Sequence, residues 1–303
     1  MASDSTVAQE QLARRFSRST LLSPIVRRFA FVRRYPVAGV GLGILFLTVV
    51  VAVLAPLIAP YPPNQVLVGI QLMGPSADHI MGTDQLGRDL ASRIVYGART
   101  SVVVGIGVVS ISTSLALVIG LASGYLGGWF DLAVQRLVDA VQAMPGLIVV
   151  LALVTFLGRG LFVIILVIGL TLVASTSRVV RAGTIGIKPQ PFVEAAEAAG
   201  ATKMRVIFRH ILPNVLPIVI VLASLQVGAA ILIEGALSFL GYGVKPPTPT
   251  WGGILGVEGR QSLMLNPWMV VFPTLALSLV VLAANLVGDT LRDMLDPRLR
   301  GRH

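Results

Sequence analysis

The sequence predicts an all-α membrane protein with six transmembrane helices and both termini in the cytoplasm. Hydrophobic residues make up 55% of the 303 residues and charged residues only 13%. This composition is typical of a chain that lies mostly in lipid, and the sequence contains six apolar runs that we interpret as spans. Arginines cluster before the first apolar run and after the last one. Basic segments next to spans stay in the cytoplasm.

The net charge of +10 is better explained by membrane topology than by nucleic acid. Basic residues cluster at the ends of apolar runs, and no aromatic-basic face is visible. We therefore expect no nucleic-acid partner, and an attraction to anionic membrane lipid instead. The chain has no cysteine, which excludes disulfides and thiolate metal sites.

The arginine distribution also predicts the order of the segments. Residues 1–35 carry seven arginines against two acids and are expected to form a cytoplasmic N-terminal segment. Residues 36–59 are apolar over a length far beyond the core of a signal peptide, so they are expected to form a retained first transmembrane helix. Residues 60–100 are then extracytoplasmic, residues 101–288 form a five-helix core, and residues 289–303 form a cytoplasmic tail.

The extracytoplasmic segment ends in a helical pattern. Leu90 and Ile94 recur at helical spacing, and Asp89 can pair with Arg93 one turn later. Helix capping and a surface helix are the favoured interpretation. The alternative is a metal site made from Asp78, Asp84 and Asp89, whose spacing matches no calcium loop, and we predict no metal site.

Two spans are expected at about residues 101–125 and 132–157. The second begins with a polar stripe, because four polar residues recur every three or four positions along one helical face: Asp131, Gln135, Asp139 and Gln142. Intramembrane polar residues seldom face lipid. The stripe can pack against a neighbouring helix near the cytoplasmic end, or Gln135, Asp139 and Gln142 can line a translocation path. Pro145 predicts a kink in this span.

The remaining spans are expected at about residues 161–174, 212–240 and 268–287. Arg178, Arg181 and Lys188 follow the first of them, so its end lies in the cytoplasm. The polar island that comes next, residues 192–214, is therefore cytoplasmic as well.

The polar island predicts a helix, a turn and a second helix. Pro191 suits the first helical position, where its missing N–H costs nothing. Gly200 suits the left-handed position after the helix, and Thr202 can cap a second helix that runs to His210. Pro213 closes the island. The first helix is rich in alanine and has almost no side-chain relief, so another protein can approach its backbone closely.

Glu194-Ala195-Ala196, Gly200 and the later Leu212-Pro213 resemble the EAA loop of ABC-importer permeases. In that family the loop is the coupling helix, held in a groove of a separate ATPase subunit. The general pattern has isoleucine two positions before Leu-Pro, where this chain has His210. The resemblance implies ATPase coupling by Phe192, Glu194, Ala195, Ala196, Ala199, Gly200, Arg205, Leu212 and Pro213.

Two outer segments, residues 79–100 and 241–255, resemble the dipeptide and oligopeptide subfamily of these permeases, specifically its C-type subunit. The matching strings are GTDQLGRDLASRIVYGART and GYGVKPPTPTWGGIL. In the second string, successive prolines favour a stiff backbone and tryptophan prefers the membrane interface, although a plain structural loop is the alternative. We expect both segments to dock an extracytoplasmic substrate-binding protein through Asp84, Arg88, Asp89, Pro247 and Trp251.

The resemblance implies a type I ABC importer permease in the bacterial cytoplasmic (inner) membrane. The complete transporter would hold this chain, a homologous second permease, two ATPase subunits and the binding protein. The chain has no G-x-x-x-x-G-K-[ST] sequence, so we expect no ATPase site and no cofactor here, with ATP and Mg bound by the partner ATPases. The implied function is import of di- or oligopeptides by alternating access.

Three alternatives remain open at this point. Related permeases carry nickel or other small solutes. An ion-coupled secondary transporter would be expected to show broken helices and paired charges near the midplane, and the sequence shows neither clearly. A membrane enzyme would need a reactive constellation, but the chain has no H-E-x-x-H and no G-x-S-x-G.

Overall fold

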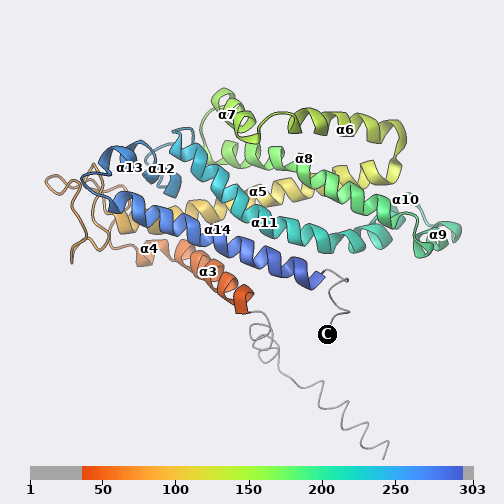
Figure 1. Cartoon of the computed structure of the whole chain (residues 1–303), viewed down its shortest axis with the longest axis horizontal. Coiled ribbons are helices and arrows are strands. Elements are labelled where there is room, and N and C mark those ends of the chain that lie inside the picture. Colours follow the sequence, from red (N-terminus) through yellow and green to blue (C-terminus); the bar gives the residue numbers. More distant parts are fainter. Residues whose placement is uncertain (1–35, 296–303) are drawn as a thin grey trace, which may run out of the picture.

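The computed structural model describes residues 36–295, and the regular secondary structure in this range is helical, apart from one isolated bridge between Thr83 and Asp89. The expectations for residues 1–35 and 296–303 lie outside the described residues. The helices, labelled as in Figure 1, are α3 Pro36–Val53, α4 Ala55–Ile58, α5 Leu90–Leu126, α6 Gly128–Gln142, α7 Gly146–Leu157, α8 Leu161–Ile187, α9 Pro191–Ala198, α10 Lys203–Val206, the π-helical turn η1 Ile207–Ile211, α11 Leu212–Phe239, α12 Trp251–Leu255, α13 Val257–Ser262 and α14 Trp268–Leu295.

Five helical stretches in the described part of the chain are long and apolar enough to cross a membrane: α3, α5, α8, the run Lys203–Phe239 and α14. The α6–α7 pair makes a sixth candidate, but its two helices are bent by 89°. The span expected at residues 132–157 is thus divided into two helices, at the place where Pro145 predicted a kink. Pro145 lies in the break because proline lacks an N–H and clashes with the preceding turn of a helix.

Several helices extend beyond the apolar runs that predicted them. α5 begins at Leu90 rather than near residue 101, because the Asp89 carboxylate caps it and accepts a bond from the Ser92 N–H at 2.7 Å. The expected surface helix is thus the start of the span. α8 continues to Ile187 and α14 to Leu295, since a helix propagates into polar sequence once it is nucleated.

α5 and α8 run side by side in the same direction and form the most closely packed helix pair. Glycines on α5 face side chains at matching heights on α8, with Gly120 against Val180 and Gly124 against Thr184. Small residues let membrane helices approach closely. Because parallel neighbours need a return crossing, α6 and α7 together lead the chain back between the two ends of the bundle (Figure 1).

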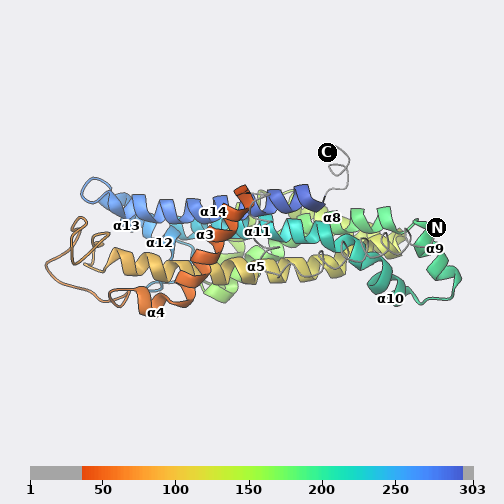
Figure 2. The same ribbon diagram turned by 90° about the horizontal axis from the view of Figure 1, so that it is seen from below.

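The polar features lie at opposite ends of the bundle. α9 and α10 are at one end, while α12, α13 and the loop of residues 59–89 are at the other (Figures 1 and 2). α5 joins these ends, because its 37 residues measure about 55 Å at helical rise. A contact made at one end is therefore linked to the other by one uninterrupted helix.

Candidate functional site

The first half of the polar island has the predicted conformation. Pro191 is the first residue of α9, and Gly200 has a φ of +81°. The Gly200 N–H donates to the Glu197 carbonyl at 2.9 Å, and the Ala201 N–H donates to the Ala196 carbonyl at 3.0 Å. This pair of bonds is a Schellman motif, which requires a left-handed residue at the position of Gly200.

The second half of the island differs from the expectation. The Thr202 hydroxyl caps α10 as predicted and accepts from the Arg205 N–H at 3.4 Å. The helix does not end at His210, however, but passes through the π-helical turn η1 into α11. Pro213 therefore lies inside a continuous helix, just after a turn whose bonding pattern is irregular. π-turns of this kind are frequent at functional sites.

The predicted coupling residues form an open surface. Seven of the nine are exposed, and Ala196 and Leu212 are half-buried; the exposed ones are Phe192, Glu194, Ala195, Ala199, Gly200, Arg205 and Pro213. The opposite side of the island is anchored, since Val193, Val206 and Ile211 are buried against α5 and α8. The structure thus brings the nine residues together at one end of the bundle, and no part of residues 36–295 covers their alanine-rich face.

Polar contacts that the sequence analysis missed tie the island to α5. The Tyr125 hydroxyl in the last turn of α5 donates to Glu197 Oε1 at 2.9 Å. Lys188 Nζ donates to the Tyr125 carbonyl at 2.8 Å and lies 5.1 Å from the centre of its ring. Tyr125 and Glu197 are 72 positions apart in the sequence, and no local pattern indicates that they bind each other.

The polar stripe of α6 lies against α5 and α8. Asp131 receives two bonds from Arg181, from Nε at 2.6 Å and from Nη2 at 2.5 Å. Gln135 Nε2 donates to the Ser123 hydroxyl at 3.3 Å, and Asp139 pairs with Arg178. These contacts support the packing interpretation for all three residues.

The last stripe residue, Gln142, is exposed at the end of α6. No contact of the stripe identifies a solute, so the translocation role of Gln135, Asp139 and Gln142 stays a prediction.

Four of the five expected docking residues are buried and cannot themselves touch a docked protein. Asp84, Arg88, Asp89 and Trp251 are each at most 5% exposed, whereas Pro247 is exposed. The physical reason is that each of these polar groups has a hydrogen-bond or ionic partner inside the protein. Arg88 Nε lies 2.6 Å from Asp84 Oδ2, and Asp89 Oδ1 lies 2.9 Å from His79 Nδ1. They hold the outer loop together from within.

The ionic contacts of this loop bear on two smaller expectations. Arg93 Nε lies 3.4 Å from Asp84 Oδ2, and its pairing with Asp89 stays a prediction. No group of three or more His, Asp or Glu side chains in residues 36–295 is arranged to hold a metal ion.

The two outer segments are joined to each other and to α5. Trp251 Nε1 donates to the Ile94 carbonyl at 3.0 Å, and the Thr100 hydroxyl donates to the Pro249 carbonyl at 3.0 Å. A Cβ on Gly97 would lie 2.8 Å from the indole ring, so the helix and the tryptophan fit closely. The outer segments are therefore one unit built on the first turns of α5.

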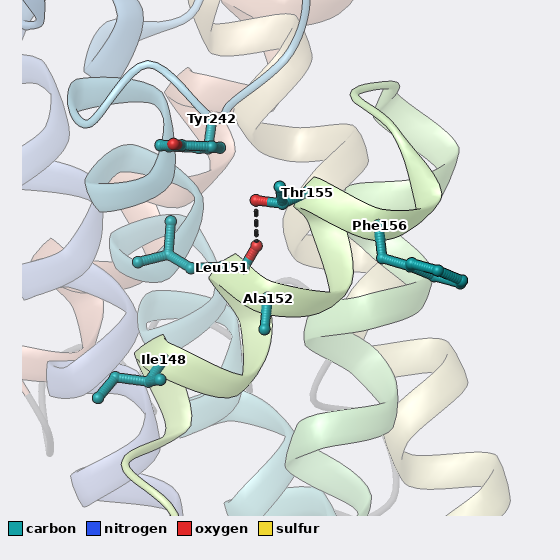
Figure 3. Close-up of a pocket in the computed structure, with 6 residues that line it drawn as sticks. All are labelled: Ile148, Leu151, Ala152, Thr155, Phe156 and Tyr242. Carbon is teal, nitrogen blue, oxygen red and sulfur yellow. Dashed lines mark hydrogen bonds between the residues drawn. The ribbon is translucent and has the colours of Figure 1, made fainter.

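An open groove of about 550 Å³ lies beside this outer unit, between α7 and the chain that follows α11. Figure 3 shows Tyr242 beside Leu151 and Thr155, while Phe156 points away from it. The Thr155 hydroxyl is occupied by its own helix and donates to the Leu151 carbonyl at 2.7 Å. The lining is mostly apolar. The groove lies beside the bent α6–α7 pair and is open at the surface of the described residues.

A second polar cluster lies midway along the bundle and was not predicted. The Ser112 hydroxyl on α5 donates to Gln226 Oε1 on α11 at 2.6 Å, and Gln226 Nε2 donates to the Thr176 hydroxyl on α8. The sequence does contain one indication of this cluster, because Gln226 is a polar residue in the middle of an apolar run. The cluster joins three spanning helices at one depth.

Two family models match the chain. The model for the binding-protein-dependent transport system inner membrane component matches residues 116–301. The model for the N-terminal transmembrane domain of oligopeptide transport permease C matches residues 23–75.

Curated relatives match over nearly the full length. The chain is 40% identical over 281 residues to a dipeptide transport system permease protein, DppC, of Alkalihalophilus pseudofirmus, with 93% of this chain and 92% of the relative covered. It is 39% identical over 276 residues to a glutathione transport system permease protein, GsiD, of Escherichia coli O6:K15:H31, with 91% and 90% covered. The protein of that name from Shigella dysenteriae is 40% identical over 276 residues, with the same shares covered.

Proposed function

The chain belongs to the inner-membrane permeases of binding-protein-dependent ABC importers, and from this premise we propose that it moves short peptides into the bacterial cytoplasm. It is a multi-pass membrane protein with the helical permease fold of that family. Relatives of about 40% identity named for dipeptide and glutathione transport support a peptide cargo over nickel or another small solute.

The observation that carries the mechanism is the length and anchoring of α5. One end of this helix bears the outer unit through Trp251 and Thr100, and the other end holds the polar island through Tyr125. We propose that the uncovered alanine face of the island sits in a groove of an ATPase subunit. Closure of the ATPases then moves the island, and the close α5–α8 pair carries that motion as a rigid body toward the outer face.

The partners follow from the same proposal. A homologous second permease, two ATPase subunits and an extracytoplasmic binding protein complete the transporter, and the ATPases bind ATP and Mg. The binding protein docks on the exposed part of the outer unit, including Pro247, rather than on the buried Asp84, Arg88, Asp89 or Trp251. In this arrangement the island and both termini are cytoplasmic, and the chain hydrolyses no ATP itself.

An ion-coupled mechanism has one structural feature in its favour, the broken α6–α7 pair. The charges of this pair do not point to a midplane ion site, because Asp131 and Asp139 are bound to Arg181 and Arg178 on α8. Salt-bridged carboxylates of this kind stabilise helix packing. ATP-driven import therefore fits the geometry better.

The test is peptide uptake by the complete complex reconstituted in lipid vesicles. The substrate is a mixture of isotope-labelled di- to pentapeptides, offered with the binding protein. We expect uptake that requires both ATP and the binding protein and that is unaffected by collapse of ion gradients. The matched control contains every subunit except this chain and should take up nothing. Uptake driven by an ion gradient without ATP would contradict the proposal.

A further inference from the structure

The polar cluster midway along the bundle is centred on the side-chain amide of Gln226. This residue lies near the midpoint of α11 and is half-buried, whereas Ser112 and Thr176 are buried. Its oxygen accepts from Ser112 at 2.6 Å and its nitrogen donates to Thr176. The Thr176 hydroxyl in turn donates to the Leu172 carbonyl at 3.0 Å. These bonds fix the orientation of the amide.

A groove of about 220 Å³ opens beside this amide, between α8 and α11. These helices are neighbours in the bundle (Figure 1). Three polar residues contribute to the lining, namely Ser175, Thr176 and Gln226, and the remainder is aliphatic. Intramembrane polar residues rarely face lipid, so the groove is expected to face a water-filled path or another protein.

The chemistry of the amide selects among possible occupants. A glutamine side chain offers two N–H donors and an oxygen with two lone pairs, and the bonds to Ser112 and Thr176 use one of each. What it can still offer is one donor beside one acceptor. A peptide bond presents the complementary pair, a carbonyl and an N–H. The amide is uncharged, so it does not hold either charged end of a peptide strongly.

We propose that this groove is a transit site for the backbone of the peptide that the chain imports, with the Gln226 amide bonded to one peptide group of the cargo. The inference rests on the proposed function. The aliphatic lining accepts different cargo side chains, while the amide recognises the backbone that all peptides share. The groove is smaller than typical ligand pockets, which suits brief contact with a short stretch of chain, and solutes in transit must bind weakly enough to leave.

The first test compares two variants of the reconstituted complex, using the labelled peptide that the unmodified complex takes up fastest. Gln226→Leu keeps the bulk and removes the amide, and we expect uptake to fall roughly ten-fold, the effect of losing one buried hydrogen bond to the cargo. Binding-protein-stimulated ATP hydrolysis should stay within about two-fold, because neither end of α5 is altered.

The matched control is Ser112→Ala. It removes a hydrogen bond from the same amide, but Ser112 does not line the groove. The bond to Thr176 still holds the amide beside the groove in this variant, so uptake should stay within about two-fold of normal. A merely structural cluster predicts instead that both variants lose uptake and ATP hydrolysis together, and that result would overturn the proposal. If the unmodified complex takes up no peptide, the proposed function itself has failed.

A second test needs no transport. The natural chain lacks cysteine, so Ser175→Cys places a single thiol in the groove. We expect a water-soluble maleimide to label it in the assembled complex and added peptide to slow the labelling. Ser110→Cys, an exposed position on α5 outside the groove, should show no effect of peptide. Labelling of Ser175→Cys only by a lipid-soluble maleimide would show a lipid-facing groove and refute the transit site.

Discussion

Replacing Gly200 with valine is expected to leave the permease in the membrane but to separate it from its ATPase subunits or to uncouple hydrolysis from uptake. Gly200 has a φ of +81° and closes the Schellman motif at the end of α9. A residue with a Cβ costs about 1 to 2 kcal/mol in this conformation, and a branched one costs more. The space around Gly200 is open, so the effect comes from the backbone and not from a clash.

The measurement is co-purification of the ATPases with the variant, together with uptake in vesicles. Gly200→Asn is the matched control, because asparagine tolerates the left-handed conformation and should keep most of the activity. Normal assembly and normal uptake in Gly200→Val would mean that the turn has no part in coupling.

The second large effect is expected for Gly120→Leu in the α5–α8 contact. A Cβ at this position would lie 2.6 Å from the Val180 Cβ and 2.7 Å from the Ser177 carbonyl oxygen. A backbone oxygen cannot rotate away, so the helices must separate. Overpacking a close contact typically costs about 1 to 3 kcal/mol. We expect the melting temperature of the purified permease in detergent to fall by roughly 6 °C, since 1 kcal/mol corresponds to about 2 to 4 °C in domains of 150 to 250 residues.

Gly43→Leu is the control for this change. Gly43 lies on the exposed face of α3, and a Cβ there would meet nothing within 4 Å. The melting temperature of the Gly43→Leu variant should be unchanged or slightly raised, because leucine forms helices more readily than glycine. Equal melting temperatures for the two variants would contradict the account of α5 and α8 as one rigid unit.

The parts of the fold that depend on local chemistry could be predicted from the sequence. Three residues of the polar island have strong conformational preferences, and the structure follows them. Pro191 starts a helix, Gly200 takes the left-handed turn, and Thr202 caps the next helix. Hydropathy likewise located the spans, but it could not give their ends. A helix that is capped by Asp89 or stabilised by packing continues beyond its apolar run.

The parts that depend on distant contacts could not be predicted. Asp84 and Arg88 are charged residues in a polar segment, so the sequence favoured a surface role. Their mutual ion pair is what allows both to be buried. The Tyr125–Glu197 bond and the Ser112–Gln226–Thr176 cluster likewise join helices far apart in the chain. Pro145 did predict a local distortion, but the 89° bend depends on how α7 packs.

The central claim is that the polar island contacts an ATPase subunit while the outer unit contacts the binding protein. Site-specific cross-linking in the assembled complex tests it most directly. The cysteine-free chain permits one thiol at a time, at Ala195 in the polar island or at Thr248 in the outer unit, and both positions are exposed. Each thiol is modified with a photoactivated benzophenone, and the cross-linked partner is identified by mass spectrometry. The account predicts that Ala195→Cys cross-links to an ATPase subunit and Thr248→Cys to the binding protein. A cross-link from Ala195→Cys to the binding protein, or from Thr248→Cys to an ATPase, would contradict it.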